Sequence, residues 1–324
     1  MSSNANRLLI TGAAGRVGQA VLPYLRRHYP LRLLDRLPIP GAAAADEVIV
    51  GDLCQPEVAR AAVKGCRGVL HLACVHGIEA GFEETLDANY RSLLSVLQAC
   101  VETGVDTGVG TGVDGCVNTG GDTDLDPTAA AGAEAGAASG VERFVYTSSH
   151  HVFGQHLRER FDQNSAVLAP DSFYGLSKVF GEALCGLFAK RYGLRTLLIR
   201  LGNADPTVSD ARRAALWSGA ADLSQLVAIG LEHPDVHLEL VYGVSRCLGG
   251  LFSNERAEQL GYRPEQDAAD HLGADYLSFE AMPATDGPEF VGGAYAARPL
   301  PRWSGAGSST KQDVPQDQGW RLFE

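Results

Sequence analysis

Several features that would assign this chain to a membrane, to an oxidising compartment or to a nucleic-acid partner are missing from its 324 residues. No uninterrupted apolar run is long enough to span a bilayer, and residues 1–7 contain no apolar signal core. No basic stripe is present, and the formal net charge of -12 disfavours nucleic acid and anionic membranes as partners. We therefore expect a cytoplasmic protein.

The cysteines also lack the spacings that would give them a structural task. None of them forms a Cys-x-x-Cys pair, so we expect reduced thiols and no metal site. The seven cysteines are at positions 54, 66, 74, 100, 116, 185 and 247.

What is present fits an ordinary globular chain, with 45% hydrophobic and 20% charged residues. Short β-rich runs alternate with helical patterns to about residue 200, which predicts an α/β fold with a Rossmann-type, doubly wound parallel sheet. We expect strands at 7–11, 31–35, 47–52, 68–73, 143–149, 196–201 and 238–242. We expect helices at 16–27, 56–63, 83–100, 174–192 and 222–232.

A glycine-rich turn follows the first predicted strand. Gly12, Gly15 and Gly18 are spaced three apart and lead into a helix, the pattern that lets a backbone approach a pyrophosphate. Asp35 ends the second predicted strand about twenty residues after the glycines, where an acid holds the adenosine ribose hydroxyls. A carboxylate there repels a ribose phosphate, which favours NAD as cofactor, although the neighbouring Arg36 is the residue that could reverse this preference.

The chain divides into three predicted parts. Residues 1–202 form the NAD-binding domain, and a Thr-Gly-Val-Asp-rich stretch at 103–140 interrupts it as a flexible insertion. Calcium binding by this stretch is set aside, since the ligand spacing of known calcium loops is absent. Residues 203–303 form a small substrate-binding portion that partly returns to the sheet near 237–244, and residues 304–324 form a loose tail.

Two residues of one predicted helix are suited to moving a proton. Tyr174 and Lys178 are four residues apart and project from the same face. A nearby ammonium favours the phenolate, so we expect Lys178 to lower the pKa of Tyr174 toward the working range. Ser149, at the polar end of a predicted strand, is expected to orient the reacting oxygen.

Taken together, these motifs resemble the extended short-chain dehydrogenase/reductases of the NAD-dependent epimerase/dehydratase family. Within it, the chain is most similar to NAD-dependent uronate dehydrogenases, which oxidise the anomeric carbon of glucuronate or galacturonate to a lactone. The matching segments are the glycine turn, Gly51-Asp52-Leu53, His71-Leu72-Ala73, Asn89, Tyr174-x-x-x-Lys178, Ser148-Ser149-His150-His151, Arg200-Leu201-Gly202-Asn203, Gly261-Tyr262-Arg263-Pro264 and Phe290-Val291-Gly292-Gly293.

The resemblance implies a set of site residues. Those expected at the cofactor are Gly12, Gly15, Arg16, Val17, Gly18, Asp35, Asp52, Leu53, Leu72, Ala73, Cys74, Asn89, Tyr174, Lys178 and Leu201. Those expected at the substrate are His76, Gly77, Ser149, His150, His151, Asn203, Arg212 and Phe290. Arg212, five residues before Trp217, falls where the family places its carboxylate-binding arginine, and its planar fork suits a carboxylate or a phosphate. The resemblance also implies a homo-oligomer, associated through the helices at 83–100 and 174–192.

Three departures from the uronate dehydrogenase pattern leave the substrate open. His76 stands where the family has serine, His150 replaces asparagine and Asn203 replaces serine. His150 is interpreted as a hydrogen-bonding wall or as a second base. A sugar-phosphate dehydrogenase and a nucleotide-sugar epimerase or dehydratase are the enzymatic alternatives, the latter disfavoured by the short substrate portion. A non-catalytic NAD sensor is the alternative of another class.

Overall fold

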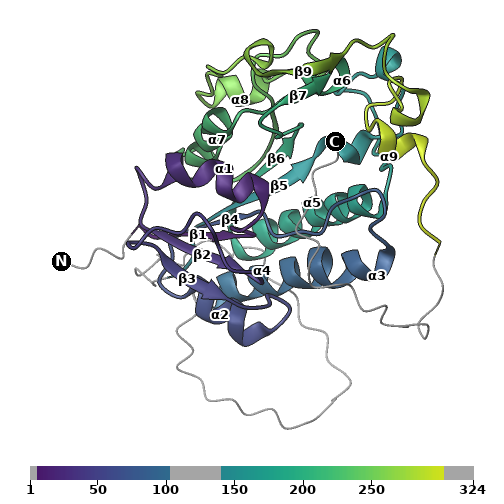
Figure 1. Ribbon diagram of the computed structural model, residues 1–324. Helices are drawn as coiled ribbons and strands as arrows, with labels where there is room; N and C mark the ends of the chain where they lie inside the picture. Colours follow the sequence, from purple (N-terminus) through teal and green to yellow (C-terminus); the bar gives the residue numbers. More distant parts are fainter. Residues whose placement is uncertain (1–5, 103–139, 303–324) are drawn as a thin grey trace, which may run out of the picture.

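The computed structural model describes residues 6–102 and 140–302, and its centre is a seven-stranded parallel sheet (Figure 1). The strand order β3-β2-β1-β4-β5-β6-β8 confirms the predicted α/β fold with a doubly wound parallel sheet. The strands are β1 (Leu8–Thr11), β2 (Leu31–Asp35), β3 (Glu47–Val50), β4 (Gly68–His71), β5 (Arg143–Ser149), β6 (Arg195–Leu201) and β8 (Leu238–Gly243). The predicted insertion and tail lie almost wholly outside the described residues.

The sheet is covered on both faces because its inner strands are apolar on both sides. Leu8 and Ile10 of β1 pack into a core beneath α1 (Arg16–Leu25) and α7 (Ala220–Glu232). Leu9 points the other way, into a second core that faces the opposite helical layer. That layer contains α2 (Pro56–Val63), α4 (Ser92–Glu102) and α5 (Phe173–Tyr192), which lie below the sheet in Figure 1.

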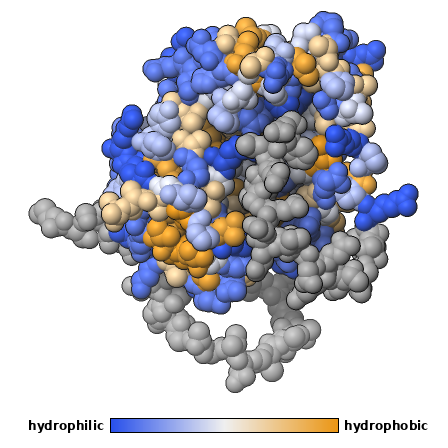
Figure 2. Space-filling model, in the orientation of Figure 1, coloured by the Kyte–Doolittle hydropathy of each residue, from blue (hydrophilic) through white to orange (hydrophobic). Residues whose placement is uncertain are grey.

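Strand β3 is one of the two outer strands of the sheet and is less covered than the inner strands. Val48 and Val50 are two residues apart on β3, so both side chains lie on the same face, and both are exposed, as is Leu37 after β2. Figure 2 shows apolar side chains gathered over this edge of the sheet.

No helix among the described residues is long and apolar enough to cross a membrane.

Short elements outside the main sheet were not predicted from the sequence. Strands β7 (Val208–Asp210) and β9 (Leu272–Leu277) pair in parallel and, with α6 (Ala211–Ala214) and α8 (Glu255–Gln259), lie beyond β6 and α7 in Figure 1. The remaining elements are the short helix α9 (Ala294–Ala297) and the 3-10 turns at His150–Phe153, Arg158–Arg160, Ala268–His271 and Ala284–Asp286.

The helix predicted at 83–100 is not continuous. It begins as α3 (Phe82–Thr85), passes through a π-helical turn at Leu86–Arg91, and continues as α4. Such wide turns within helices are often found at functional sites because they redirect side chains. Here the π turn carries Asn89, one of the predicted site residues.

Candidate active site

The glycine turn between β1 and α1 brings backbone segments into close contact. Gly12 has a φ of 71°, and a β-carbon there would lie 2.6 Å from the amide nitrogen of Ala73. A β-carbon on Gly18 would lie 2.6 Å from the carbonyl oxygen of Gly12. Both positions therefore require glycine, and the first N–H groups of α1 have no side-chain cap. This geometry fits a dinucleotide, whose pyrophosphate such N–H groups hold.

Asp35 ends β2 beside this turn. Its Oδ2 accepts a hydrogen bond from the Ala14 amide at 3.0 Å, and its Oδ1 accepts one from the Leu37 amide at 3.1 Å. The two bonds fix the carboxylate where the sequence predicts the ribose hydroxyls. After β3, Asp52 accepts a bond from the Cys54 amide at 2.9 Å, and Leu53 is buried in the second core.

The segment after β4 is tied to both neighbouring elements. Leu72 donates its amide to the Thr11 carbonyl at 3.1 Å, and the chain then runs through Ala73 and Cys74 to Val75. Asn89 holds this segment from the π turn: its Oδ1 accepts the Val75 amide at 2.7 Å, and its Nδ2 donates to the Val75 carbonyl at 2.9 Å. The same Nδ2 donates to Ser177 Oγ at 2.8 Å. A direct contact of Asn89 with the cofactor stays a prediction, while its observed contacts all fix the loop to α5.

The predicted catalytic residues come together at the junction of β5 and α5. Ser149 is the last residue of β5, and Tyr174 lies in the first turn of α5, where the Ser172 hydroxyl accepts the Gly175 amide at 3.0 Å. The Ser149 side chain is hydrogen-bonded to that of Tyr174. Lys178 is one turn further along α5 and is buried. Its Nζ donates to the Thr147 carbonyl at 2.8 Å and lies 5.5 Å from the centre of the Tyr174 ring.

The expected lowering of the Tyr174 pKa by Lys178 is not found: the pKa is raised. Burial raises the pKa of Tyr174 well above its usual value, and the hydrogen bond from Ser149 opposes this rise. The physical reason is desolvation, which penalises the phenolate in a site from which water is largely excluded. Lys178 directs its ammonium group to a backbone carbonyl rather than to the phenol oxygen.

Two histidines, His76 and His151, flank Tyr174, and a third, His150, packs against His151. The His76 ring lies 6.1 Å from the Tyr174 ring, the His151 ring lies 5.6 Å from it, and the His150 and His151 rings are 4.1 Å apart. Burial lowers the pKa of His150 well below its usual value, as do the charges of His151 and Arg212. His150 is therefore neutral, which favours a hydrogen-bonding wall over a second base.

The environment of His150 leaves one ring nitrogen available. Its Nδ1 lies 3.2 Å from the carbonyl oxygen of Leu201, at the end of β6. Its Nε2 is buried and has no hydrogen-bond partner among the described residues. A buried nitrogen without a partner is costly, so a ligand hydroxyl is a suitable partner.

Arg212, the predicted anion-binding residue, lies on the short helix α6. It is 7% exposed, and burial lowers its pKa to about 10. One of its terminal nitrogens donates to the Val291 carbonyl at 3.1 Å. No carboxylate pairs with it within the described ranges, whereas its neighbour Arg213 is paired with Asp210. Arg212 is thus a largely buried cation with most of its donors unused.

The remaining predicted residues border the site less directly. Asn203 donates its Nδ2 to Asp205 at 3.1 Å, and Asp205 forms an ion pair with Arg16 of the glycine turn. Val17 packs against the first core. Gly77 has a φ of 142° in the loop that carries His76.

The structure adds two residues that the sequence analysis missed. The Tyr295 ring lies 4.2 Å from the His151 ring and 6.4 Å from the Tyr174 ring. Asp171 lies 2.6 Å from Nδ1 of His151. The aromatic residue expected at the substrate was Phe290, whose backbone instead pairs with Leu157, and no ring contact joins it to these residues in the described part of the chain. A contact of Phe290 with the substrate stays a prediction; the only sequence signal of Tyr295 was its position two residues after a glycine pair.

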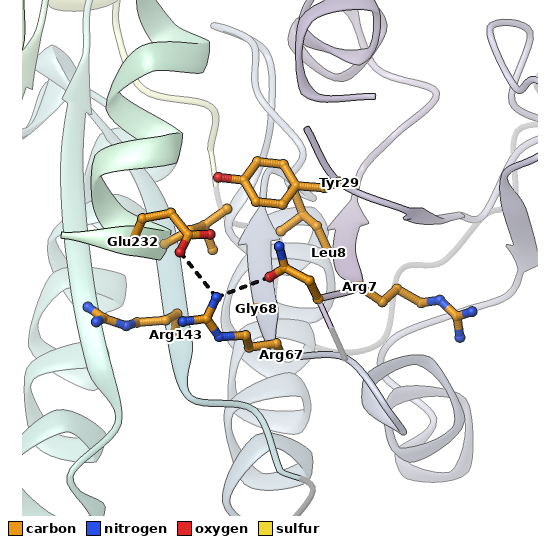
Figure 3. A pocket seen from close by; sticks show the side chains of 9 residues that line it. Arg7, Leu8, Tyr29, Arg67, Gly68, Arg143 and Glu232 are labelled. Atoms are coloured by element: carbon orange, nitrogen blue, oxygen red, sulfur yellow. Dashed lines mark hydrogen bonds and ion pairs between the residues drawn. The ribbon is translucent and has the colours of Figure 1, made fainter. Parts of the chain in front are cut away.

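A separate small hollow lies at the amino ends of the strands, away from these residues (Figure 3). There Arg67 donates to Glu232 and to Asn6, both at 3.1 Å, and the Tyr29 ring lies close by. Because Arg67 is paired with Glu232 and Arg143 donates to the His233 and Val236 carbonyls, we assign the hollow a structural role. Within the described residues, no group of three or more potential ligands could hold a metal ion.

Comparison with known proteins gives consistent matches. Residues 8–204 match the NAD dependent epimerase/dehydratase family. A uronate dehydrogenase of Pseudomonas putida is 31% identical, over 90% of this chain and 96% of that protein. An NAD-dependent glucose-6-phosphate dehydrogenase of Haloferax volcanii is 30% identical, over 85% of this chain and 97% of that protein.

A solved structure extends the match to three dimensions. The glucuronic acid dehydrogenase of Chromohalobacter salexigens superposes with a TM-score of 0.70 and 28% identity, covering 91% of this chain and 97% of that one. The predicted family and the predicted cofactor, NAD, are both confirmed. The chain belongs to the NAD dependent epimerase/dehydratase family.

Proposed function

We propose that this protein oxidises a hexuronic acid, glucuronate or galacturonate, at C1 with NAD and releases an aldarolactone. The coarser assignment follows from the family and its relatives: the chain is an NAD-dependent oxidoreductase similar to dehydrogenases of sugar acids and sugar phosphates. The choice of a uronate rests on one observation, which is the state of Arg212.

A buried guanidinium without an anionic partner is unfavourable unless a ligand supplies the partner. Arg212 uses one nitrogen for the Val291 carbonyl, and a carboxylate can take two parallel hydrogen bonds from the rest of its planar fork. A sugar that carries a carboxylate supplies this group. Its opposite end, the anomeric carbon, then faces the side of the site formed by Tyr174 and Ser149.

In the proposed reaction, Tyr174 removes the proton of the anomeric hydroxyl while Ser149 holds that oxygen by a hydrogen bond. NAD, when bound at the glycine turn and Asp35, would supply the acceptor for the hydride of the C1–H bond, and C1 would become the carbonyl carbon of a lactone. Lys178, held by the Thr147 carbonyl, supplies positive charge near the phenolate that the reaction requires. The released proton passes to solvent.

The remaining substrate contacts are proposed from position. His76 and His151 flank Tyr174, His150 packs against His151, and all three would offer ring nitrogens to the sugar hydroxyls. We further propose that residues 203–303 act as the substrate-binding portion, because Arg212 and Tyr295 both belong to it. A portion of this size suits a single sugar better than a nucleotide sugar.

A sugar phosphate is the second candidate. Arg212 would grip a phosphate as well as a carboxylate, and one relative, that of Haloferax volcanii, is a glucose-6-phosphate dehydrogenase. The two candidates share the proposed mechanism and differ only in the anion on Arg212.

The deciding experiment measures NADH formation by the purified protein with glucuronate, galacturonate, glucose 6-phosphate and neutral hexoses. We expect turnover of a uronate, and a loss of kcat/KM of at least about 100-fold in Arg212→Ala, since a buried charge pair is removed. Arg213→Ala is the matched control, because Arg213 is the neighbouring arginine, is more exposed than Arg212 and is already paired with Asp210. A preference for the phosphate would transfer the substrate to the second candidate, and equal rates with neutral hexoses would contradict the role of Arg212.

A further inference from the structure

Asp171 is a carboxylate with no exposed side-chain surface, directly before the helix that carries Tyr174 and Lys178. Its Oδ2 lies 2.6 Å from Nδ1 of His151, and its Oδ1 accepts a hydrogen bond from the Ser172 hydroxyl at 2.8 Å. Within 4.0 Å, the only cationic or potentially cationic partner of this carboxylate in the described residues is His151. Burial of a carboxylate is costly unless it is strongly hydrogen-bonded, so this pairing has to be explained.

The carboxylate occupies a slot whose walls are glycines from three separate segments. A β-carbon on Gly154 or on Gly292 would overlap Asp171 Oδ2, and one on Gly175 would lie 3.1 Å from Oδ1. The Gly292 amide donates to the Gly154 carbonyl at 3.0 Å and closes the slot. The slot holds a carboxylate in one place and leaves it no freedom to turn away from His151.

This arrangement fixes the state of the His151 ring. Nδ1 must carry a proton to bond the carboxylate, so in the neutral ring Nε2 is the nitrogen with a free lone pair. Among residues 6–102 and 140–302 the hydrogen bond found for the His151 ring is that of Nδ1, and the side chain keeps 10% of its surface exposed. The ring itself is confined by Tyr295 at 4.2 Å and His150 at 4.1 Å, measured between ring centres.

We propose that Asp171 is a positioning residue that holds His151 in the tautomer with Nε2 free, so that Nε2 binds a sugar hydroxyl beside the carbon on which Tyr174 acts. The proposal rests on the proposed function for the identity of that ligand. Asp171 does not touch substrate or cofactor in this arrangement and acts only through His151. A carboxylate behind a histidine orients ring nitrogens in this way in metal sites and in catalytic triads.

A structural role for Asp171 is the competing explanation, since it adjoins the start of α5. The Gly175 amide of that helix is capped by the Ser172 hydroxyl, and the carboxylate contacts the cap only through this hydroxyl, which donates to Asp171 Oδ1. The two explanations differ in one respect. A positioning residue loses its effect when His151 is absent, whereas a structural residue does not.

The test uses the full chain with NAD bound. In ¹⁵N-histidine NMR spectra, we expect wild-type His151 to be protonated at Nδ1 and bare at Nε2, and Asp171→Ala to shift toward the Nε2-protonated form that free histidine prefers. Asp171→Asn, which has nearly the same shape, replaces it if the alanine variant does not fold. Asp162→Ala, at an exposed carboxylate, is the matched control.

The same variants are assayed for NADH formation. Loss of Asp171 is expected to lower kcat/KM on a uronate by about 10- to 100-fold, as for other outer partners of a ligating histidine, and to leave the Kd for NAD within about twofold. In a His151→Gln background, the further change on removing Asp171 should be less than about twofold. An equal loss in both backgrounds, or an unchanged His151 tautomer, would overturn the proposal. Absence of uronate turnover in the wild type would contradict the proposed function alone, because the NMR comparison needs no sugar.

Discussion

Arg16 and Asp205 form an ion pair that joins the start of α1 to the segment after β6. Asp205 is held in turn by Asn203, whose Nδ2 donates to it at 3.1 Å, and its carbonyl accepts the Trp217 indole N–H at 2.7 Å. The pair therefore spans the predicted cofactor site from its pyrophosphate side to its substrate side, and Arg16 has to leave Asp205 if it is to bind a phosphate.

Asp205→Asn is expected to strengthen NAD binding. The variant releases Arg16 toward the pyrophosphate, and an exposed ion pair is worth about 0.2–1 kcal/mol, so the Kd should fall by up to about fivefold. Arg16→Ala should raise the Kd. Fluorescence titration with NADH measures both. If Asp205→Asn weakened binding as much as Arg16→Ala does, the pair would be positioning Arg16 rather than competing for it.

Tyr174→Phe is expected to lower kcat by at least about 1,000-fold, because the general base is removed while the ring is kept. The Kd for NAD should change little, since the phenyl ring of the variant can keep the packing of the Tyr174 ring beside His76 and His151. Initial-rate assays of NADH formation test the change in kcat, and a titration with cofactor tests the Kd. Tyr192→Phe, at an exposed tyrosine on the same helix, is the control, and substantial residual activity in Tyr174→Phe would remove the residue from the reaction.

The pH dependence should show an alkaline rise. Burial raises the pKa of Tyr174 well above its usual value, so below that pKa the phenolate fraction, and with it kcat/KM, increases as the pH rises. The Ser149 hydrogen bond lowers this pKa, and Ser149→Ala should therefore shift the rise to higher pH. Initial rates across the alkaline range with saturating NAD test this prediction. A flat profile would mean that a step other than proton removal limits the rate.

Cofactor preference should depend on Asp35. Asp35→Ser removes the charge that repels a ribose phosphate, so kcat/KM should fall with NAD and rise with NADP, each by about tenfold. Asp35→Asn removes the charge but keeps an oxygen that can accept a hydrogen bond from the Ala14 or Leu37 amide. This variant therefore distinguishes the effect of the charge from the effect of losing these hydrogen bonds. An unchanged preference in both variants would assign the selection to Arg36 or another residue.

Self-association through α4 and α5, implied by resemblance, is a prediction that surface substitutions can test. Phe180 and Leu187 of α5 are 37% and 54% exposed, and Leu94 of α4 is exposed near the same layer. Phe180→Glu combined with Leu187→Glu should lower the mass measured by light scattering, because it places charge on the proposed apolar face. Val50→Glu, at the exposed β3 edge, is the control. An unchanged mass would place any oligomer contact elsewhere.

The sequence predicted those features that repeat a local pattern. Strand β5 and helix α2 have the predicted bounds. The strand is determined by a β-rich apolar run and the helix by apolar residues at helical spacing, and both patterns are local. The same is true of Gly12 and Gly18, whose spacing reflects a backbone contact that no other residue permits. Tyr174 and Lys178 follow from their separation by one helical turn.

Features that depend on contacts between distant segments were missed. The π turn at Leu86–Arg91 has no periodic signal in the sequence, and it carries Asn89, whose contact with Val75 joins segments 14 residues apart. Tyr295 and Asp171 reach His151 from opposite ends of the second half of the chain. The Tyr174 pKa was expected to fall because the charge of Lys178 is visible in the sequence, whereas the burial that raises it is not.

The glycine slot around Asp171 has an evolutionary consequence. Any side chain at Gly154 or Gly292 would collide with the carboxylate, so neither glycine can change while Asp171 remains. Conversely, a lineage that lost Asp171 would be released from both constraints at once. Among homologous sequences, these positions should therefore vary jointly: glycine is expected at 154 and 292 where residue 171 is Asp, and other residues are allowed where it is not.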